Sequence, residues 1–183
     1  MTAGIFGGSF NPVHNGHTAL AKALVDTGVV DQVWLTLSPL NPLKANPEEL
    51  VPDNMRLEML RLAANDVPGL EVCDIELSLP RPSYTINTLH ALSALYPHTC
   101  FRLVIGSDNM LIFDKWKDHR EIMSHYSPIV YPRPGYPCDN ALPLPVSDIS
   151  STLVREKIRN GQSVKGLINP AVENYIRQHG LYL

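Results

Sequence analysis

The stretch Gly7-Gly-Ser-Phe-Asn-Pro-Val-His-Asn-Gly-His17 decides how this chain folds. A short apolar run at residues 3–7 leads into it, and residues 18–25 follow it with apolar residues and alanines at helical spacing. The three segments therefore predict a strand, a glycine-containing loop and a helix in direct succession.

The same alternation continues along the chain. Pro-rich loops interrupt it at residues 38–52 and before residue 145, and Asp53 is a plausible N-cap of the second helix. Asn169 is the expected cap of the last helix, which should end near Gly180. Further strands are predicted at residues 31–37, 70–73, 100–105 and 128–131, and further helices from residue 53, at 85–96, at 150–158 and from residue 170.

Strands that alternate with helices predict an α/β fold with a Rossmann-like, doubly wound parallel sheet and helices on both faces. A length of 183 residues with 44% hydrophobic content favours a single domain over residues 1–183. Ligands of such sheets bind beyond the carboxyl ends of the strands. We therefore expect a site at the loops that follow the first and fourth strands.

Composition narrows the choice of partners. The 15 Lys and Arg residues against 18 Asp and Glu residues give a net charge of -3, so neither nucleic acid nor an anionic membrane is an expected partner. Cys73, Cys100 and Cys138 match no C-x-x-C spacing, which favours reduced thiols. The start of the chain resembles no signal peptide, and no run of about 18 apolar residues occurs, so we expect a cytoplasmic protein. Oligomeric state is left open.

The first loop has the chemistry of an anion site. Glycines allow the backbone to approach a phosphate closely, and a helix that follows them offers free N–H groups and partial positive charge. His14 and His17 would share one face of a helical turn and add two titratable donors. Each imidazole could instead be a structural hydrogen-bonding residue. The loop contains neither G-x-G-x-x-G nor a P-loop Gly-Lys-Ser/Thr, which disfavours a nicotinamide dehydrogenase.

A second candidate phosphate element is Ile149-Ser-Ser-Thr-Leu-Val-Arg155. Ordinary capping explains hydroxyls at a helix start, because serine and threonine are favoured there. Three consecutive hydroxyls exceed what one cap requires, and the guanidinium of Arg155 could reach phosphate oxygens in a fork geometry.

Both elements resemble motifs of the nucleotidyltransferase superfamily. The first loop is similar to its G-G-[ST]-F-[DN]-P-x-H-x-G-H signature, and residues 149–155 are similar to the I-S-S-T-x-[IV]-R motif of its adenylyltransferase branch. The resemblance implies that His14, His17 and Arg155 are catalytic and stabilise charge as pyrophosphate leaves. It implies ATP with Mg²⁺ and no metal site built from protein ligands. The implied ATP site comprises Gly8, Ser9, Phe10, His14, His17, Gly106, Asp108, Ile149, Ser150, Ser151, Thr152 and Arg155.

The middle of the chain resembles one branch more closely. Arg81-Pro-Ser-Tyr-Thr-Ile-Asn-Thr-Leu89 is similar, with a shortened front end, to R-x-[SG]-x-[ST]-[YF]-T-x-[DN]-T-L of bacterial nicotinate-nucleotide adenylyltransferases. The resemblance implies nicotinate mononucleotide as the acceptor of AMP, with its carboxylate near Thr85. The implied acceptor site comprises Lys44, Tyr84, Thr85, Asp108, Trp116 and Arg133.

Several alternatives stay open. Trp116 could stack on the pyridine ring or belong to the core, and Lys44 could be an ordinary surface lysine. Leu43 stands where many relatives carry histidine, while Asn11 and Ser107 are smaller departures. A sibling enzyme would use nicotinamide mononucleotide or phosphopantetheine as acceptor. A non-catalytic nucleotide sensor would keep the fold without the chemistry.

Overall fold

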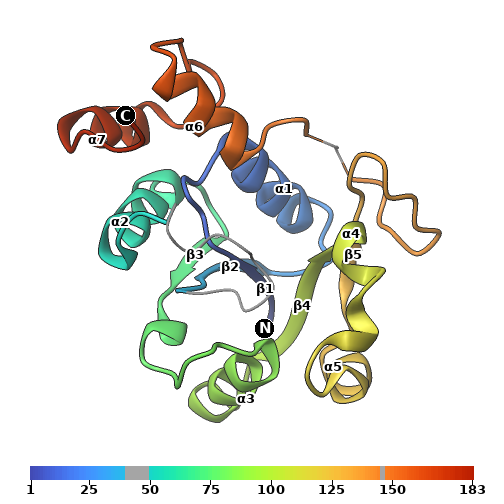
Figure 1. The fold of residues 1–183 in the computed structure, drawn as a ribbon. Coiled ribbons are helices and arrows are strands. Elements are labelled where there is room, and N and C mark those ends of the chain that lie inside the picture. Colours follow the sequence, from blue (N-terminus) through green and yellow to red (C-terminus); the bar gives the residue numbers. More distant parts are fainter. Residues whose placement is uncertain (40–49, 145–146) are drawn as a thin grey trace.

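Five parallel strands form one sheet at the centre of the molecule, in the order β3-β2-β1-β4-β5 (Figure 1). The computed structural model describes residues 1–39, 50–144 and 147–183. The chain adds β2 and β3 on one side of β1 and then returns to add β4 and β5 on the other. Their bounds are β1 Thr2–Gly8, β2 Gln32–Leu37, β3 Leu70–Cys73, β4 Cys100–Gly106 and β5 Ile129–Tyr131. The strand order therefore reverses between β1 and β4, where a doubly wound sheet binds its ligand.

Each face of the sheet is covered by its own set of helices (Figure 1). Side chains alternate along the strands, so Phe6 belongs to one core and its neighbour Ile5 to the other. One face carries α1 (Asn15–Asp26), α2 (Asp53–Ala64), α6 (Ser151–Arg159) and α7 (Pro170–Gln178). The opposite face carries α3 (Thr85–Leu95) and α5 (His119–Tyr126). The prediction of a doubly wound parallel sheet with helices on both faces is confirmed.

Shorter helical segments complete the connections. They are η2 (Ile75–Leu77), α4 (Ser107–Met110) and η3 (Phe113–Lys115). In the described parts of the chain, every helix is too short or too polar to cross a membrane. The extent of the domain over residues 1–183 stays a prediction.

The caps of α6 and α7 are formed by residues that favour these positions. Asn169 caps α7, since its side chain accepts a hydrogen bond from the Ala171 N–H at 2.8 Å. Ser150 caps α6 in the same way. Gly161 follows α6 with a φ of 64°, a conformation that glycine adopts without strain.

Two expectations about the helices were incomplete or wrong. Asp53 is not the N-cap of α2, because Pro52 occupies that position and Asp53 is the first helical residue. The Asp53 carboxylate instead accepts hydrogen bonds from the side chains of Arg56 and Arg81. No helix was predicted at α5, whose sequence is mostly polar and which buries only Ile122 and Tyr126. Two apolar residues four apart fix the face of a helix but give a weak periodic signal.

The core between the sheet and helices α3 and α5, named the second core, offers a test of the packing. Leu89 on α3 is 0% exposed between the helix and the sheet. Leu89→Ala should lower the free energy of unfolding by about 2–5 kcal/mol, because it removes buried methyl groups and leaves a cavity. Leu95→Ala is the matched control on the same helix, since Leu95 is 65% exposed. Urea denaturation measures both, and equal losses in the two variants would contradict this packing.

Candidate functional site

The loop after β1 lies at the point where the sheet reverses its strand order. Gly8 ends β1, and the Phe10 ring lies so close over it that a Cβ at Gly8 would be 3.0 Å from the Phe10 Cζ. Ser9 and Phe10, two of the predicted ATP contacts, are both buried within this loop. Phe10 has a φ of 44°, which is uncommon for a residue other than glycine. The backbone conformation of this part of the loop therefore depends on the packing of the Phe10 ring against Gly8 as well as on the glycine itself.

The two histidines lie side by side at the start of α1. Their ring centroids are 3.6 Å apart and the rings are stacked. His14 is the N-cap residue, and its backbone N–H donates to Nδ1 of His17 at 3.2 Å. A neutral His17 ring that accepts at Nδ1 carries its proton on Nε2, which makes Nε2 a donor. Gly16 is required between them, because a Cβ there would lie 3.0 Å from the His14 Nδ1 and 2.7 Å from the Ser147 Oγ.

His14 is buried as a neutral ring. Its side chain is 6% exposed, and Nδ1 has no hydrogen-bond partner among the described residues. Burial, and after it the positive charge of Arg133, lowers the pKa of His14 to about 4. The ring is thus uncharged at neutral pH and lies in a small cavity that His17, Tyr131, Arg133 and Ile149 also line.

Helix α6 is hydrogen-bonded directly to the first loop, residues 7–17, which carries His14 and His17 and is named the histidine loop. The Ser151 hydroxyl donates to the carbonyl of Pro12 at 2.8 Å, and Nη1 of Arg155 donates to the carbonyl of Asn11 at 3.0 Å. The two bonds join residues that are separated in the sequence by 139 and 144 positions, respectively. The structure therefore places the N-terminus of α6 beside the loop that carries the two imidazoles.

Ser150, Thr152 and Ile149, which also belong to the second candidate phosphate element at residues 149–155, are either exposed or partly buried. Ser150 is exposed and accepts the Leu153 N–H at 3.1 Å, which is an ordinary N-cap bond. Thr152 is exposed. Ile149 is partly buried and lines the histidine cavity. Of the three hydroxyls, Ser150 acts as the cap and Ser151 holds the first loop.

The turn after β4 lies next to the end of β1, because the two strands are neighbours in the sheet. Gly106 is the N-cap of α4, and a Cβ there would lie 2.3 Å from Oδ1 of Asp108. Asp108 faces Arg133, with 3.7 Å between carboxylate Oδ2 and Nε. The Ser107 hydroxyl accepts the Arg133 N–H at 2.9 Å and donates to the Tyr136 carbonyl at 2.7 Å, which ties the chain after β5 to this turn. The predicted residues Gly106, Asp108 and Arg133 are thus brought together.

Of the predicted acceptor residues, Tyr84, Thr85 and Trp116 line one cavity of about 320 Å³ beside the first loop, whereas Asp108 and Arg133 do not. Gly8 lines it from β1, and Tyr84, Thr85 and Trp116 line it from the opposite face of the sheet. Thr85 is the first residue of α3, where backbone N–H groups lack helical partners. Trp116 contacts both the cavity and the second core, so the stacking and core interpretations are compatible. Its Nε1 is buried without a hydrogen-bond partner in the described part of the chain. Lys44 lies outside the described residues.

The cavity also contains residues that the sequence analysis missed. Glu76 is buried, and its Oε1 accepts the Thr88 hydroxyl at 2.9 Å. Burial raises the pKa of Glu76, although the bond from Thr88 acts in the opposite direction. Lys115 and Lys117 line the rim, and Lys117 Nζ lies 5.0 Å from the centre of the Tyr84 ring. The position of both lysines beside Trp116 could have suggested this contact, whereas nothing in the sequence marks Glu76 as buried.

A doubly wound sheet with a histidine-bearing glycine loop at its reversal point defines an α/β protein with a candidate ligand site where the strand order reverses. The model of the cytidylyltransferase-like family matches residues 5–157. The chain belongs to this nucleotidyltransferase family and, within it, to the group named for nicotinate-nucleotide adenylyltransferases.

Individual relatives are similar over most of their length. The chain is 44% identical to a Bacteroides fragilis protein named "probable nicotinate-nucleotide adenylyltransferase", over 96% of this chain and 90% of the relative. A Porphyromonas gingivalis protein of the same name is 46% identical over 90% of this chain and 88% of its own length. Among solved structures, nicotinic acid mononucleotide adenylyltransferase of Plasmodium falciparum complexed with NaAD shares the fold, with a TM-score of 0.78, 18% identity and coverage of 99% and 97% of the two chains.

Burial of neutral His14 predicts a dependence of stability on pH. Its pKa is about 4 in the folded protein, against 6.5 for an exposed histidine. The folded state therefore resists protonation, and the stability gained from this is present above pH 6.5 and lost as the pH falls through about 4. The loss amounts to about 3 kcal/mol.

Urea denaturation of the wild type and of His14→Gln across this pH range measures the effect. The free energy of unfolding of the wild type should fall more steeply toward low pH than that of the variant. Parallel curves would show that His14 is not held neutral by burial.

Proposed function

We propose that this chain is a nicotinate-nucleotide adenylyltransferase, which transfers AMP from ATP to the phosphate of nicotinate mononucleotide and yields deamido-NAD and pyrophosphate. The observation that carries the proposal is the bonding of the histidine loop to α6 beside a cavity lined by Thr85 and Trp116. The names of the bacterial relatives support it. So do the Plasmodium falciparum complexes with NaAD and with APC, which share the fold.

The ATP phosphates would bind between the first loop and α6. Nε2 of His17 can donate to a phosphate oxygen, because Nδ1 already accepts the His14 N–H. Arg155, which is bonded to Asn11, and Arg133, which lines the same small cavity as the two imidazoles, add positive charge. The N-termini of α1 and α6 contribute partial positive charge from their backbone dipoles. These groups are fixed before the substrate arrives, so they stabilise developing negative charge without reorganisation.

The remaining residues of the predicted ATP site would have supporting roles. Gly8 and Gly106 allow Phe10 and Asp108 to pack closely against the backbone where the sheet reverses its strand order. The buried side chains of Ser9 and Phe10 anchor the loop in the protein interior, and Asp108 orients Arg133. Ile149, Ser150, Ser151 and Thr152 form the start of α6, where backbone N–H groups face the phosphates.

The acceptor would occupy the cavity across β1. The free N–H groups at the start of α3, together with the Thr85 hydroxyl, suit the carboxylate of a nicotinate ring. Trp116 offers an indole face for stacking on that ring, and Tyr84 forms the rim. Lys44 is proposed to place positive charge on the acceptor phosphate. Lys115 and Lys117 can add to that charge, since both line the same cavity.

The transfer itself is an in-line displacement at the α-phosphorus of ATP. The acceptor phosphate is already ionised at neutral pH, so it attacks without a general base and forms the new P–O bond as the bond to pyrophosphate breaks. No covalent enzyme intermediate is required. Positioning and charge stabilisation by His14, His17 and Arg155 account for the catalysis.

Mg²⁺ is proposed to arrive as part of the ATP complex and to neutralise charge on the phosphates. In the described ranges, no group of three His, Cys, Asp or Glu side chains is placed to hold a metal ion. We propose that the ion is held chiefly by substrate phosphates and water. Reduced thiols at Cys73, Cys100 and Cys138 agree with a cytoplasmic location, where ATP is available.

His17→Ala is the first test of the mechanism. Pyrophosphate release with MgATP and nicotinate mononucleotide should fall by about 10²–10³-fold, because one preorganised donor to the developing charge is lost. His125→Ala is the control, since His125 is exposed on α5. Circular dichroism should show both variants folded, and a nearly unchanged rate for His17→Ala would refute its catalytic role.

The acceptor is tested with the wild-type chain. Nicotinate mononucleotide should give a much higher kcat/KM than nicotinamide mononucleotide or phosphopantetheine. A preference for either of the latter would identify a sibling transferase. ATP binding without pyrophosphate release for any acceptor would identify a nucleotide sensor.

A further inference from the structure

Arg56 on α2 is a fully buried guanidinium outside the proposed ligand contacts. Its side chain is 0% exposed, although arginine is among the residues least often buried. Removing a charged group from water is costly unless the group is paired and fully hydrogen-bonded. The acceptors of the Arg56 hydrogen bonds therefore indicate which parts of the structure this residue holds in place.

All five N–H donors of this guanidinium have acceptors. Nη1 donates to the carbonyls of Ser9 at 2.6 Å and Ser38 at 2.9 Å. Nε donates to the carbonyl of Val51 at 3.0 Å. Nη2 donates to the carbonyl of Pro39 at 3.0 Å and to the carboxylate of Asp53. A guanidinium has five donors, so its hydrogen-bonding capacity is used completely.

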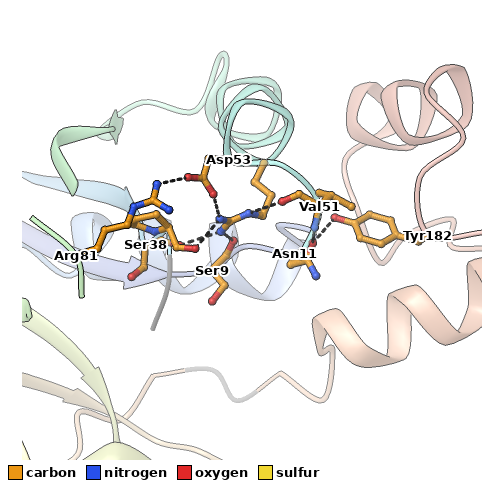
Figure 2. Close-up of polar contacts among 9 residues, drawn as sticks. Ser9, Asn11, Ser38, Val51, Asp53, Arg81 and Tyr182 are labelled. Carbon is orange, nitrogen blue, oxygen red and sulfur yellow. Dashed lines mark hydrogen bonds and ion pairs between the residues drawn. The ribbon is translucent and has the colours of Figure 1, made fainter. Parts of the chain in front are cut away.

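The four carbonyls come from parts of the chain that the proposed reaction uses. Ser9 lies in the loop between β1 and the two histidines, and Ser38 directly follows β2. Pro39 and Val51 lie on either side of the undescribed segment 40–49, which contains Lys44. Figure 2 shows Ser9, Ser38 and Val51 gathered around one point, with Asp53 and Arg81 to one side.

A second set of bonds joins the same loop to the same neighbour. Oδ1 of Asn11 accepts the Val51 N–H at 3.2 Å and the Tyr182 hydroxyl at 2.9 Å (Figure 2). The carbonyl of Asn11 accepts Arg155. Val51 is thus bonded both to Arg56 and to Asn11, so a shift of Arg56 would be transmitted to the histidine loop at two points.

We infer that Arg56 is a positioning residue for the AMP transfer, because its guanidinium fixes the backbone on which the histidine loop and the Lys44 segment begin. This inference rests on the proposed function. Arg56 does not touch substrate, since each of its donors is bonded to the protein itself. Lysine cannot replace it, because an ammonium offers three donors in a compact group where five acceptors lie in a planar fork.

Arg56→Ala with added small cations tests the inference. Pyrophosphate release by the full chain should show kcat reduced by about 10²-fold, the size expected when catalytic groups are displaced by about 1 Å. The KM for ATP should change less, because the imidazoles act mainly on charge that develops during transfer. Ethylguanidinium should restore part of kcat by occupying the cavity left at residue 56, whereas ethylammonium at the same concentration should not.

Two further variants complete the test. Arg56→Lys should also lose kcat, and it serves as the readout if Arg56→Ala does not fold. Arg61→Ala is the matched control, because Arg61 lies on the same helix with a side chain that is 54% exposed, so its kcat should be unchanged. A folded Arg56→Ala or Arg56→Lys with wild-type kcat would overturn the inference, as would equal rescue by both cations. An inactive wild-type chain would refute the proposed function instead.

Discussion

Hydrogen bonds from α6 to the carbonyls of Asn11 and Pro12 are the constraint on which the site depends. A glycine loop at the end of a strand has many backbone conformations open to it, and most would not place two imidazoles in contact. Here the loop is held from the α6 side by Ser151 and Arg155 and from the α2 side by Arg56. The cost of ordering the loop is thus met by distant parts of the chain, before any ligand binds.

The reversal of strand order determines what this loop can reach. β1 lies between β2 and β4, so its carboxyl end faces α6 across one face of the sheet and the cavity of Thr85 and Trp116 across the other. In the proposed function, the phosphate donor and the acceptor approach one point from these two sides, as an in-line displacement requires. Burial keeps His14 uncharged, so the positive charge in the site comes from arginine side chains and helix N-termini.

The sequence predicted the parts of the fold that have strong local signals. An apolar strand followed by glycines marks β1 and its loop, and Asn169 before Pro170 marks the start of α7. Helix α5 was missed because two buried apolar residues give little periodicity. Arg56 and Glu76 were missed because burial of a charged side chain depends on acceptors and donors that lie far away in sequence. Asp53 was assigned as a cap because aspartate is favoured at helix starts, but Pro52 occupies the N-cap position and Asp53 is the first helical residue.

The most direct test of the central claim is a crystal structure of the chain with Mg²⁺ and an ATP analogue whose α,β-bridging oxygen is replaced by carbon. Phosphate oxygens should lie within hydrogen-bonding distance of the imidazoles of His14 and His17 and of the Arg155 guanidinium at the same time. A triphosphate bound to only one of these two sides, or bound elsewhere on the sheet, would contradict the claim that the first loop and α6 hold ATP together.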